Sequence, residues 1–279
     1  MKFNARFRYI LLIFGIFLST NAVCSDKRNI GEYKFGVFPY LSAARMDAIY
    51  SPISDELSSN LGLKVKFRTS STFKKFLGKL KAEYYDFALI QPFWYPVAID
   101  EKGYIPLLKM KEPFVSLIMV LDSSQIQTVD DLKGKIIATP PAFVPVVHMA
   151  RRALIKKDII PGRDVTFKAF KSVDSCFQQV LIGKASACIA PPFAPAVFEN
   201  AMKVKLRTLF KSPGIPNLAL VIHPRVSEKD RTIISKLISS WHKDPDGKKL
   251  LSNIQTKQFL PIVDKEYNVV RQFLKDLKK

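Results

Sequence analysis

The 279-residue sequence lacks the short motifs that mark many catalytic and nucleotide-binding sites. It contains no Walker phosphate-binding loop, no GxGxxG after a predicted strand, no HExxH and no GxSxG. Histidine occurs only three times, at His148, His223 and His242, without the spacing of metal ligands. We therefore expect a protein that is not an enzyme and that uses no cofactor or metal ion.

Cysteine is equally scarce, with Cys24 near the N-terminus and only Cys176 and Cys188 beyond it. Cys176 falls in a predicted helix and Cys188 in the strand that follows, so an oxidising compartment could pair them. Two buried free thiols are the alternative, and the sequence leaves both open. A nucleophile built from either cysteine and His148 is a further alternative that the spacing does not support.

Long apolar runs are absent as well, because no stretch after the N-terminus reaches the roughly 18 apolar residues of a membrane span. The first 24 residues combine basic residues, an apolar run over residues 9–18 and the small, polar stretch STNAVC. This is the layout of a secretory signal peptide, which we predict for residues 1–24, and it predicts a periplasmic protein. Cleavage after Ala22 is one interpretation, lipidation of Cys24 is a second, and a retained N-terminal anchor is a third. Asn21 stands where a lipidation motif has leucine, which favours cleavage.

The formal net charge is +20, a value that often indicates nucleic acid or a membrane surface as partner. Here the lysines are dispersed and no run of five basic residues occurs. Dispersal and predicted export both argue against a nucleic-acid partner and favour a solvated surface. Attraction to an anionic membrane surface stays open as an alternative.

Short apolar runs alternate with segments of helical periodicity, which indicates an α/β fold. The predicted strands cover residues 34–38, 64–68, 86–90, 135–139, 165–170 and 186–190. Two longer apolar runs, residues 114–122 and 217–223, stand on either side of the second group. We therefore predict two α/β lobes joined by two crossover strands. Lobe 1 would comprise residues 31–116 and 220–279, and an inserted lobe 2 would comprise residues 117–219.

Helix boundaries are marked in several places. Apolar residues from Met46 to Leu61 recur at helical spacing, with Gly62 as the expected stop and Pro52 as a point where the helix kinks or restarts. After residue 223 the pattern predicts only helices, which would begin near Ser227, Asp244 and Asp264.

Ligands of open α/β sheets bind beyond the carboxyl ends of the strands, so the segments that follow the predicted strands are the candidate site. The candidate side chains are Tyr40, Ser70, Ser71, Thr72, Gln91, Phe93, Trp94, Tyr95, Thr139 and Phe143. The hydroxyl cluster at residues 69–72 would bind an anion or merely cap a helix. The aromatic residues 93–95 would hold an organic ligand, or pack beneath the helix that follows.

Five stretches of the chain together resemble one family of transport proteins. They are YDFALIQPFWY at 85–95, DSSQIQTVDDLKGKIIAT at 122–139, KSVDSCFQQVLIGKASAC at 171–188, LFKSPGIP at 209–216 and DPDGKKLLSNI at 244–254. Over about residues 31–274 the chain is similar to the phosphate/phosphite/phosphonate-binding (PhnD-like) proteins of ABC transporters. The resemblance implies a type II periplasmic-binding-protein (Venus flytrap) fold that closes on a small-molecule ligand and delivers it to a membrane permease. We expect the protein to be a monomer. A sensory module that signals to a membrane histidine kinase or chemoreceptor is the alternative function.

The resemblance also identifies where this sequence departs from the family. The family has a Ser/Thr-rich turn after the strand matched by residues 135–139, and here that turn reads TPPAFVP. Proline has no N–H, so Thr139 alone offers a hydroxyl there. The resemblance places Asp174 at the ligand, but Val173 replaces a family histidine and Ser186 a family aspartate. We therefore expect a cleft with fewer anion contacts, in which aromatic rings decide what binds.

Overall fold

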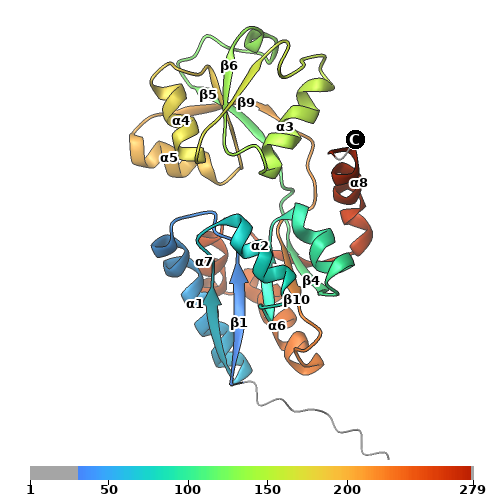
Figure 1. Ribbon diagram of the computed structural model, residues 1–279. Helices are drawn as coiled ribbons and strands as arrows, with labels where there is room; N and C mark the ends of the chain where they lie inside the picture. The colour runs from blue at the N-terminus through green and yellow to red at the C-terminus, as the bar shows by residue number, and fades with distance from the viewer. Residues whose placement is uncertain (1–30, 278–279) are drawn as a thin grey trace, which may run out of the picture. The chain divides into compact units, whose positions relative to one another are not determined.

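Two mixed sheets organise the computed structural model, which describes residues 31–277 (Figure 1). The first sheet has the order β11-β4-β10-β3-β1-β2 and the second has the order β7-β6-β8-β5-β9. The strands of the first sheet are β1 (Glu32–Val37), β2 (Lys64–Arg68), β3 (Phe87–Ile90), β4 (Ile105–Met110), β10 (Ala219–Ile222) and β11 (Phe259–Pro261). Those of the second sheet are β5 (Leu117–Leu121), β6 (Ile136–Thr139), β7 (Thr166–Ala169), β8 (Ala187–Ala190) and β9 (Leu206–Lys211). The predicted signal peptide, its cleavage after Ala22 and the alternative at Cys24 lie outside the described residues.

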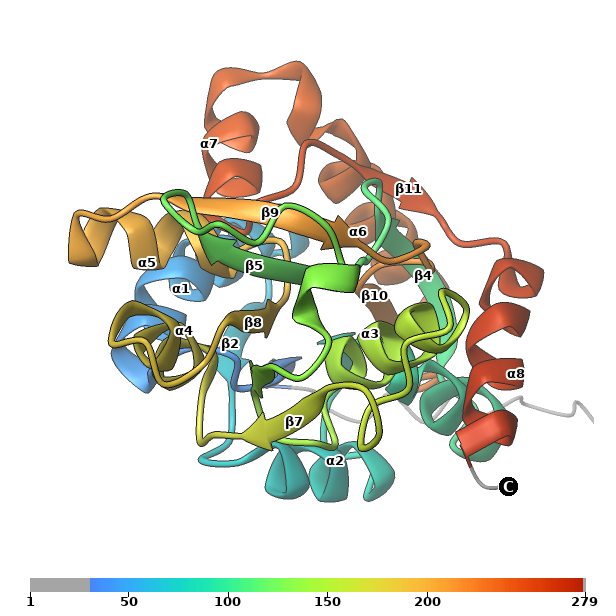
Figure 2. The ribbon, with the colours of Figure 1, turned by 90° about the horizontal axis from the view of Figure 1, so that it is seen from above.

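Eight α-helices in the described part of the chain complete two lobes, as Figures 1 and 2 show from two directions. Lobe 1 contains the first sheet with α1 (Ala43–Leu61), α2 (Phe73–Lys81), α6 (Glu228–Ser240), α7 (Pro245–Asn253) and α8 (Asn268–Leu277). Lobe 2 contains the second sheet with α3 (Pro145–Ile155), α4 (Val173–Leu181) and α5 (Ala194–Met202). Within the described residues, no helix combines the length and the apolar character needed to cross a membrane.

The strand directions place loops from both lobes at the cleft. In lobe 1, β1 runs parallel to β2 and β3, and in lobe 2, β6 runs parallel to β7 and β8. Because the carboxyl ends of parallel strands meet at one edge of a sheet, the following helices also begin at that edge. Strands β10 and β5, the two that follow the crossovers, pair antiparallel with their neighbours.

The chain crosses between the lobes twice, and the two crossings lie side by side. Residues 111–116 lead from β4 into β5, and residues 212–218 lead back from β9 into β10. Phe114 and Ile215 form an antiparallel bridge between them, and the Ser116 N–H donates to Ser212 Oγ over 2.9 Å. The predicted two-lobed fold with two crossovers is confirmed.

Some element predictions need correction. The expectation of only helices after residue 223 is wrong, because β11 pairs with β4. Strands β4 and β9 were not predicted from the sequence. Helix α1 does not restart at Pro52 but runs through it, and Gly62 ends the helix in a left-handed conformation (φ 63°), as predicted. Helices α6 and α7 begin after Ser227 and Asp244, and a short helical turn begins at Asp264, also as predicted.

The core of lobe 1 is unusually aromatic. Phe76 stacks on Tyr85 with ring centroids 4.7 Å apart and on Trp94 at 5.6 Å. Each such buried aromatic side chain contributes about 1.5–3 kcal/mol through the apolar surface it removes from water. Gly36 on β1 allows this packing, because a Cβ at that position would lie 2.6 Å from the Tyr85 ring.

Helix α8 belongs to lobe 1 but reaches lobe 2, and Figures 1 and 2 both show it beside α3. The Phe273 ring lies 5.2 Å from that of Phe93 in lobe 1. Arg152 of α3 lies over the same Phe273 ring and also pairs with Asp276 at 3.3 Å. This helix is therefore a further connection between the lobes, in addition to the two crossovers.

Candidate ligand-binding site

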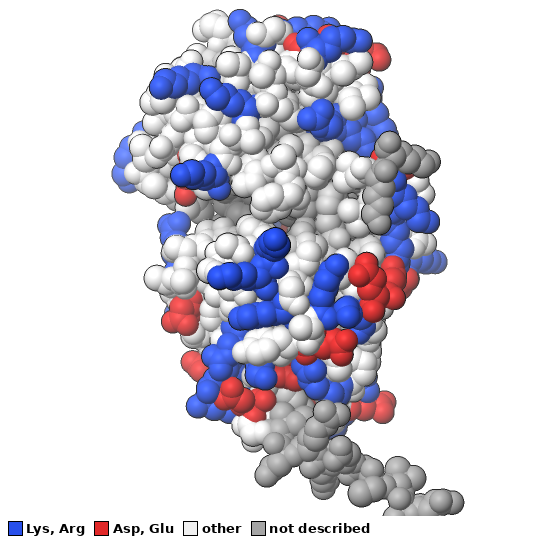
Figure 3. All heavy atoms as spheres, viewed as in Figure 1, with Lys and Arg blue, Asp and Glu red and all other residues white. Residues whose placement is uncertain are grey.

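Two adjoining chambers lie between the lobes. The space-filling view shows the surface hollowed between the two lobes (Figure 3). The larger, which we call the cleft chamber, has a volume of about 790 Å³ and is lined by residues of both lobes. The smaller, which we call the hinge chamber, has a volume of about 440 Å³ and extends to the first crossover at residues 112–114. Both volumes fall in the range of sites that hold organic ligands. The chambers share Phe38, Tyr40, Leu41, Arg45, Phe114, Phe193, Val197 and Leu218, which we call the junction.

Five helices begin at the cleft chamber. Its wall includes the first residues, or the residues just before them, of α1, α2, α3, α4 and α5. The first N–H groups of a helix have no partner inside the helix, and the helix dipole is positive at this end. The convergence of five such ends makes the cleft chamber favourable for a negatively charged ligand.

The five ends are not equivalent in chemistry. Thr72 caps α2 by accepting from the Lys75 N–H over 3.1 Å, and Ser172 caps α4 by accepting from the Ser175 N–H over 3.1 Å. Among the described residues, no side chain caps α3 or α5, and Pro145 opens α3. The absence of a cap leaves backbone N–H groups free at both ends, but a proline in the first turn of each helix removes one donor and makes this part of the wall more apolar.

Charged side chains give the cleft chamber a positive balance. Arg45, Lys74 and Lys171 line it, and Asp174 is the only acidic residue among the described lining residues. In the hinge chamber the Glu112 carboxylate is already satisfied, because it accepts from the Thr256 hydroxyl at 2.6 Å and from the Lys257 N–H at 3.1 Å. Figure 3 shows that basic side chains are also spread over the visible face, so the remaining charge is not concentrated at the chambers.

Two pairs of aromatic rings connect the lobes across the cleft chamber. Tyr40 of lobe 1 meets Phe193 of lobe 2 at 5.3 Å between centroids, and Phe73 meets Phe143 at 5.8 Å. Both pairs are edge-to-face, a favourable arrangement for aromatic rings. The Tyr40 hydroxyl bonds to that of Tyr50 at 2.9 Å, and burial raises the pKa of Tyr40, so this ring stays neutral.

Gln91 is the buried polar residue of the cleft-chamber wall. The residue is only 6% exposed, and Oε1 accepts no hydrogen bond from any described residue. An unpaired buried polar atom is unfavourable, and native structures rarely contain one without a reason. Gln91 is therefore poised to form a hydrogen bond with something that enters the chamber.

The structure brings about half of the predicted side chains together. Those that line the cleft chamber are Tyr40, Ser71, Thr72, Gln91, Phe143 and Asp174. The others lie elsewhere. Thr139 is buried at the end of β6, and the Ser70 hydroxyl lies 3.4 Å from that of Tyr85.

The three rings of residues 93–95 turn into lobe 1, because the short helical turn η1 (Pro92–Trp94) follows β3 directly. Phe93 packs against α8, and Trp94 is buried against Phe76. Tyr95 stacks on Tyr267 at 3.7 Å and donates to Asp264 over 2.9 Å.

Several wall residues were not predicted from the sequence. They are chiefly Phe38, Arg45, Phe73, Phe114, Lys171 and Phe193. Phe193 lies within the stretch PPFAPA that follows β8, so its position after a strand was a usable signal. Phe114 lies in a crossover, and nothing in the local pattern distinguishes it from a core residue.

A disulfide between Cys176 of α4 and Cys188 of β8 supports the wall in lobe 2. The Cα atoms are 5.7 Å apart, within the usual range for a disulfide, and both residues are fully buried. Asp174 lies in the first turn of α4, and the loop that contains Phe193 follows β8 directly. The disulfide therefore holds together the two elements that position these wall residues. Because both sulfurs are bonded, neither cysteine is a free thiol nucleophile.

Two mixed lobes, paired crossovers and a cavity at converging helix N-termini define a type II periplasmic binding protein. Residues 35–267 match the family model described as ABC transporter, phosphonate, periplasmic substrate-binding protein, and the chain belongs to this family. Its function is therefore to bind a substrate for an ABC importer, which confirms the function predicted from the sequence.

Solved structures support the fold at low sequence identity. PhnD1 from Prochlorococcus marinus (MIT 9301), in complex with methylphosphonate, has a TM-score of 0.73 at 17% identity and covers 89% of this chain and 99% of its own. A binding protein of a phosphonate ABC transporter from Pseudomonas aeruginosa has a TM-score of 0.72 at 15% identity, covering 87% and 85%. A Xanthomonas citri protein bound to ATP has a TM-score of 0.65 at 12% identity, covering 89% and 97%.

Proposed function

We propose that this protein captures a small organic anion in the cleft chamber and delivers it to the membrane permease of an ABC importer. In this proposal it acts in the periplasm as a monomer after removal of residues 1–24, and it does not change its ligand chemically. The single observation that supports it most is the cleft chamber itself, a cavity of about 790 Å³ whose wall comes from both lobes. A ligand there contacts both lobes at once and so favours their closure.

The wall chemistry supports an anion with an organic part. Five helix N-termini and three cationic side chains favour negative charge. Prolines and aromatic rings cover much of the remaining surface, and they favour an apolar body over a bare oxyanion. The proteins of similar fold hold ligands as different in size as methylphosphonate and ATP. The scaffold is thus compatible with an organic anion.

Closure would occur about the paired crossovers. Residues 31–116 with 220–279 would move as one body and residues 117–219 as the other. The edge-to-face pairs Tyr40–Phe193 and Phe73–Phe143 would separate on opening, because each has one ring in each lobe.

A thermal-unfolding screen tests this function. The ligand-free protein is heated with phosphate, phosphite, methylphosphonate, phenylphosphonate and neutral amino acids. We expect one class of anion to stabilise the protein by about 2.7 kcal/mol at a concentration near 100 times Kd. The ligand should be recovered unchanged.

The matched variants compare a lining lysine with an exposed one. Lys74→Gln should weaken binding, whereas Lys229→Gln, on the exposed surface of α6, should leave it unchanged. Absence of stabilisation by every anion in the screen would contradict the proposed function.

A further inference from the structure

We infer that the preferred ligand is an aromatic anion, an arylphosphonate or aryl phosphate, whose ring occupies the junction between the chambers and whose acidic group lies at the N-terminus of α2. This inference rests on the proposed function and specifies the ligand class of the same site.

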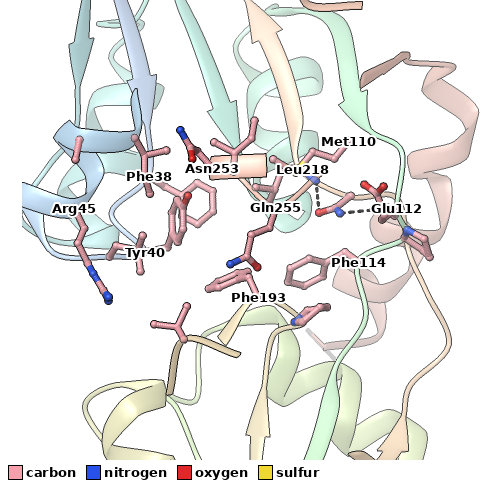
Figure 4. Close-up of a pocket in the computed structure, with 18 residues that line it drawn as sticks. Phe38, Tyr40, Arg45, Met110, Glu112, Phe114, Phe193, Leu218, Asn253 and Gln255 are labelled. Atoms are coloured by element: carbon pink, nitrogen blue, oxygen red, sulfur yellow. Dashed lines mark hydrogen bonds between the residues drawn. The ribbon is translucent and has the colours of Figure 1, made fainter. Parts of the chain in front are cut away.

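The junction has the composition of a ring-binding site. Four of its eight residues are aromatic, namely Phe38, Tyr40, Phe114 and Phe193, and only Arg45 among the eight is charged. Figure 4 shows Phe114 of the first crossover and Phe193 of lobe 2 facing the same space. A planar ring placed there would meet both ring faces and ring edges, which attract one another through their quadrupoles.

Part of this aromatic surface is uncovered. In the junction, Tyr40 and Phe193 are half-buried, whereas Phe38 and Phe114 are buried. Elsewhere in the cleft chamber, Phe73 is half-buried and Phe143 is 61% exposed. Exposed aromatic groups that converge on one cavity are uncommon on a soluble protein unless they bind something. An aliphatic or purely inorganic anion would leave this surface in contact with water, whereas a ring would cover it.

The acidic group is directed to α2 by elimination among the helix ends. Proline removes an N–H donor from the first turn of α3 and of α5, and α4 has the Asp174 carboxylate in its first turn, which repels an anion. Helix α1 begins at the junction itself, to which Arg45 belongs, and that space is assigned to the ring. The end of α2 instead combines Ser71 and Lys74 with the free N–H groups of a capped helix. Phe73, the first residue of α2, lies 6.0 Å from Phe38 of the junction, so the acidic and aromatic subsites adjoin.

Two amide side chains can accept a polar substituent on the ring. Gln91 is more than nine-tenths buried, lines the cleft chamber and has an unpaired Oε1. Gln255 has a left-handed backbone (φ 54°), uncommon for a residue other than glycine, and its side chain points toward Phe193 (Figure 4). Both groups can hydrogen-bond a ring that has hydroxyl, amino or ring-nitrogen functions.

The experiment compares phenylphosphonate with methylphosphonate by titration calorimetry. The two probes share the acidic group and differ in the ring. We expect phenylphosphonate to bind about tenfold more tightly or better, and Phe193→Leu to reduce that ratio to about threefold or less. The matched control is Phe210→Leu on β9, which lies outside both chambers and should leave the ratio unchanged.

The outcomes separate this inference from the proposed function. Methylphosphonate that binds as tightly as phenylphosphonate would overturn the aromatic ligand class while leaving the solute receptor intact. An unchanged ratio in Phe193→Leu would overturn the placement of the ring at the junction. Failure of every anion to bind would overturn the proposed function and this inference together. If Phe193→Leu does not fold, the ratio measured on the unaltered protein still decides the ligand class.

Discussion

In the proposed function, Gln91 is a residue that favours ligand binding at the expense of stability. It follows β3 directly and is surrounded by a wall that is otherwise mostly apolar. A buried methionine would fill the same space without an unpaired polar atom. Its amide is therefore best explained by a ligand that completes its hydrogen bonds.

Replacing Gln91 by methionine should raise stability and lower affinity. We expect the free energy of unfolding in urea to rise by about 1 kcal/mol, because the unpaired Oε1 is removed. Stabilisation by an arylphosphonate with a ring hydroxyl, which can donate to Oε1, should fall in the same variant. Ser54→Ala is the control, since Ser54 Oγ is also buried and unpaired among the described residues but lies outside both chambers. It should gain stability with its ligand response intact, and an equal loss of response in both variants would contradict the role of Gln91.

At the residue scale, sequence position predicts which segments reach the cleft better than it predicts which side chains face it. Tyr40, Gln91 and Phe143 could be found because each follows a strand. Phe93 and Trp94 also follow a strand, but the tight turn after β3 directs them into the core. The direction of a side chain after a strand depends on that turn, and the local pattern does not encode it.

At the scale of elements, every strand that is buried along its whole length was predicted, and so were the more exposed β2 and β7. Strands β3, β8 and β10 are buried throughout and appear in the sequence as continuous apolar runs. The strands that were missed have weaker patterns. Strand β9 lies at a sheet edge with its residues half-exposed, β4 contains Pro106 and a lysine, and β11 has only three residues.

The Cys176–Cys188 disulfide, which joins α4 to β8, should make a measurable contribution to stability. The disulfide closes a loop between residues 12 apart in sequence, so removing it by Cys176→Ala with Cys188→Ala should cost about 3 kcal/mol. Urea unfolding with and without a reductant measures this. A reductant should destabilise the unaltered protein and have no effect on the double variant. Equal sensitivity of the two proteins to the reductant would show that the disulfide does not form.

At the scale of the whole described unit, three kinds of contact connect the lobes. The crossovers are covalent connections, the aromatic pairs lie at the chamber, and α8 reaches α3 on the outside. The Arg152–Asp276 pair is exposed and contributes only about 0–1 kcal/mol. Packing of aromatic groups therefore dominates the contact between α8, η1 and α3, and a charge introduced there would loosen it.

Protonation of His148 at low pH would introduce such a charge. This residue lies on α3 of lobe 2, with its ring 6.2 Å from that of Phe93 in lobe 1. Burial, and secondly the nearby Arg151, lower the pKa of His148 below its ordinary value of 6.5. The folded arrangement thus favours the neutral ring. Its contribution to stability is complete above the unfolded-state pKa and is lost as pH falls through the lower folded-state pKa.

Acidification from about pH 7.5 to about pH 5 should therefore loosen the lobes through His148. We expect the radius of gyration from small-angle scattering to increase in the unaltered protein and to stay constant in His148→Gln. His223→Gln is the matched control, because burial also lowers the pKa of His223, but its ring lies in lobe 1 beside Glu83. That variant should lose less stability on acidification than the unaltered protein, yet expand to the same degree. Expansion of His148→Gln to the same degree would place the pH-sensitive contact elsewhere in the protein.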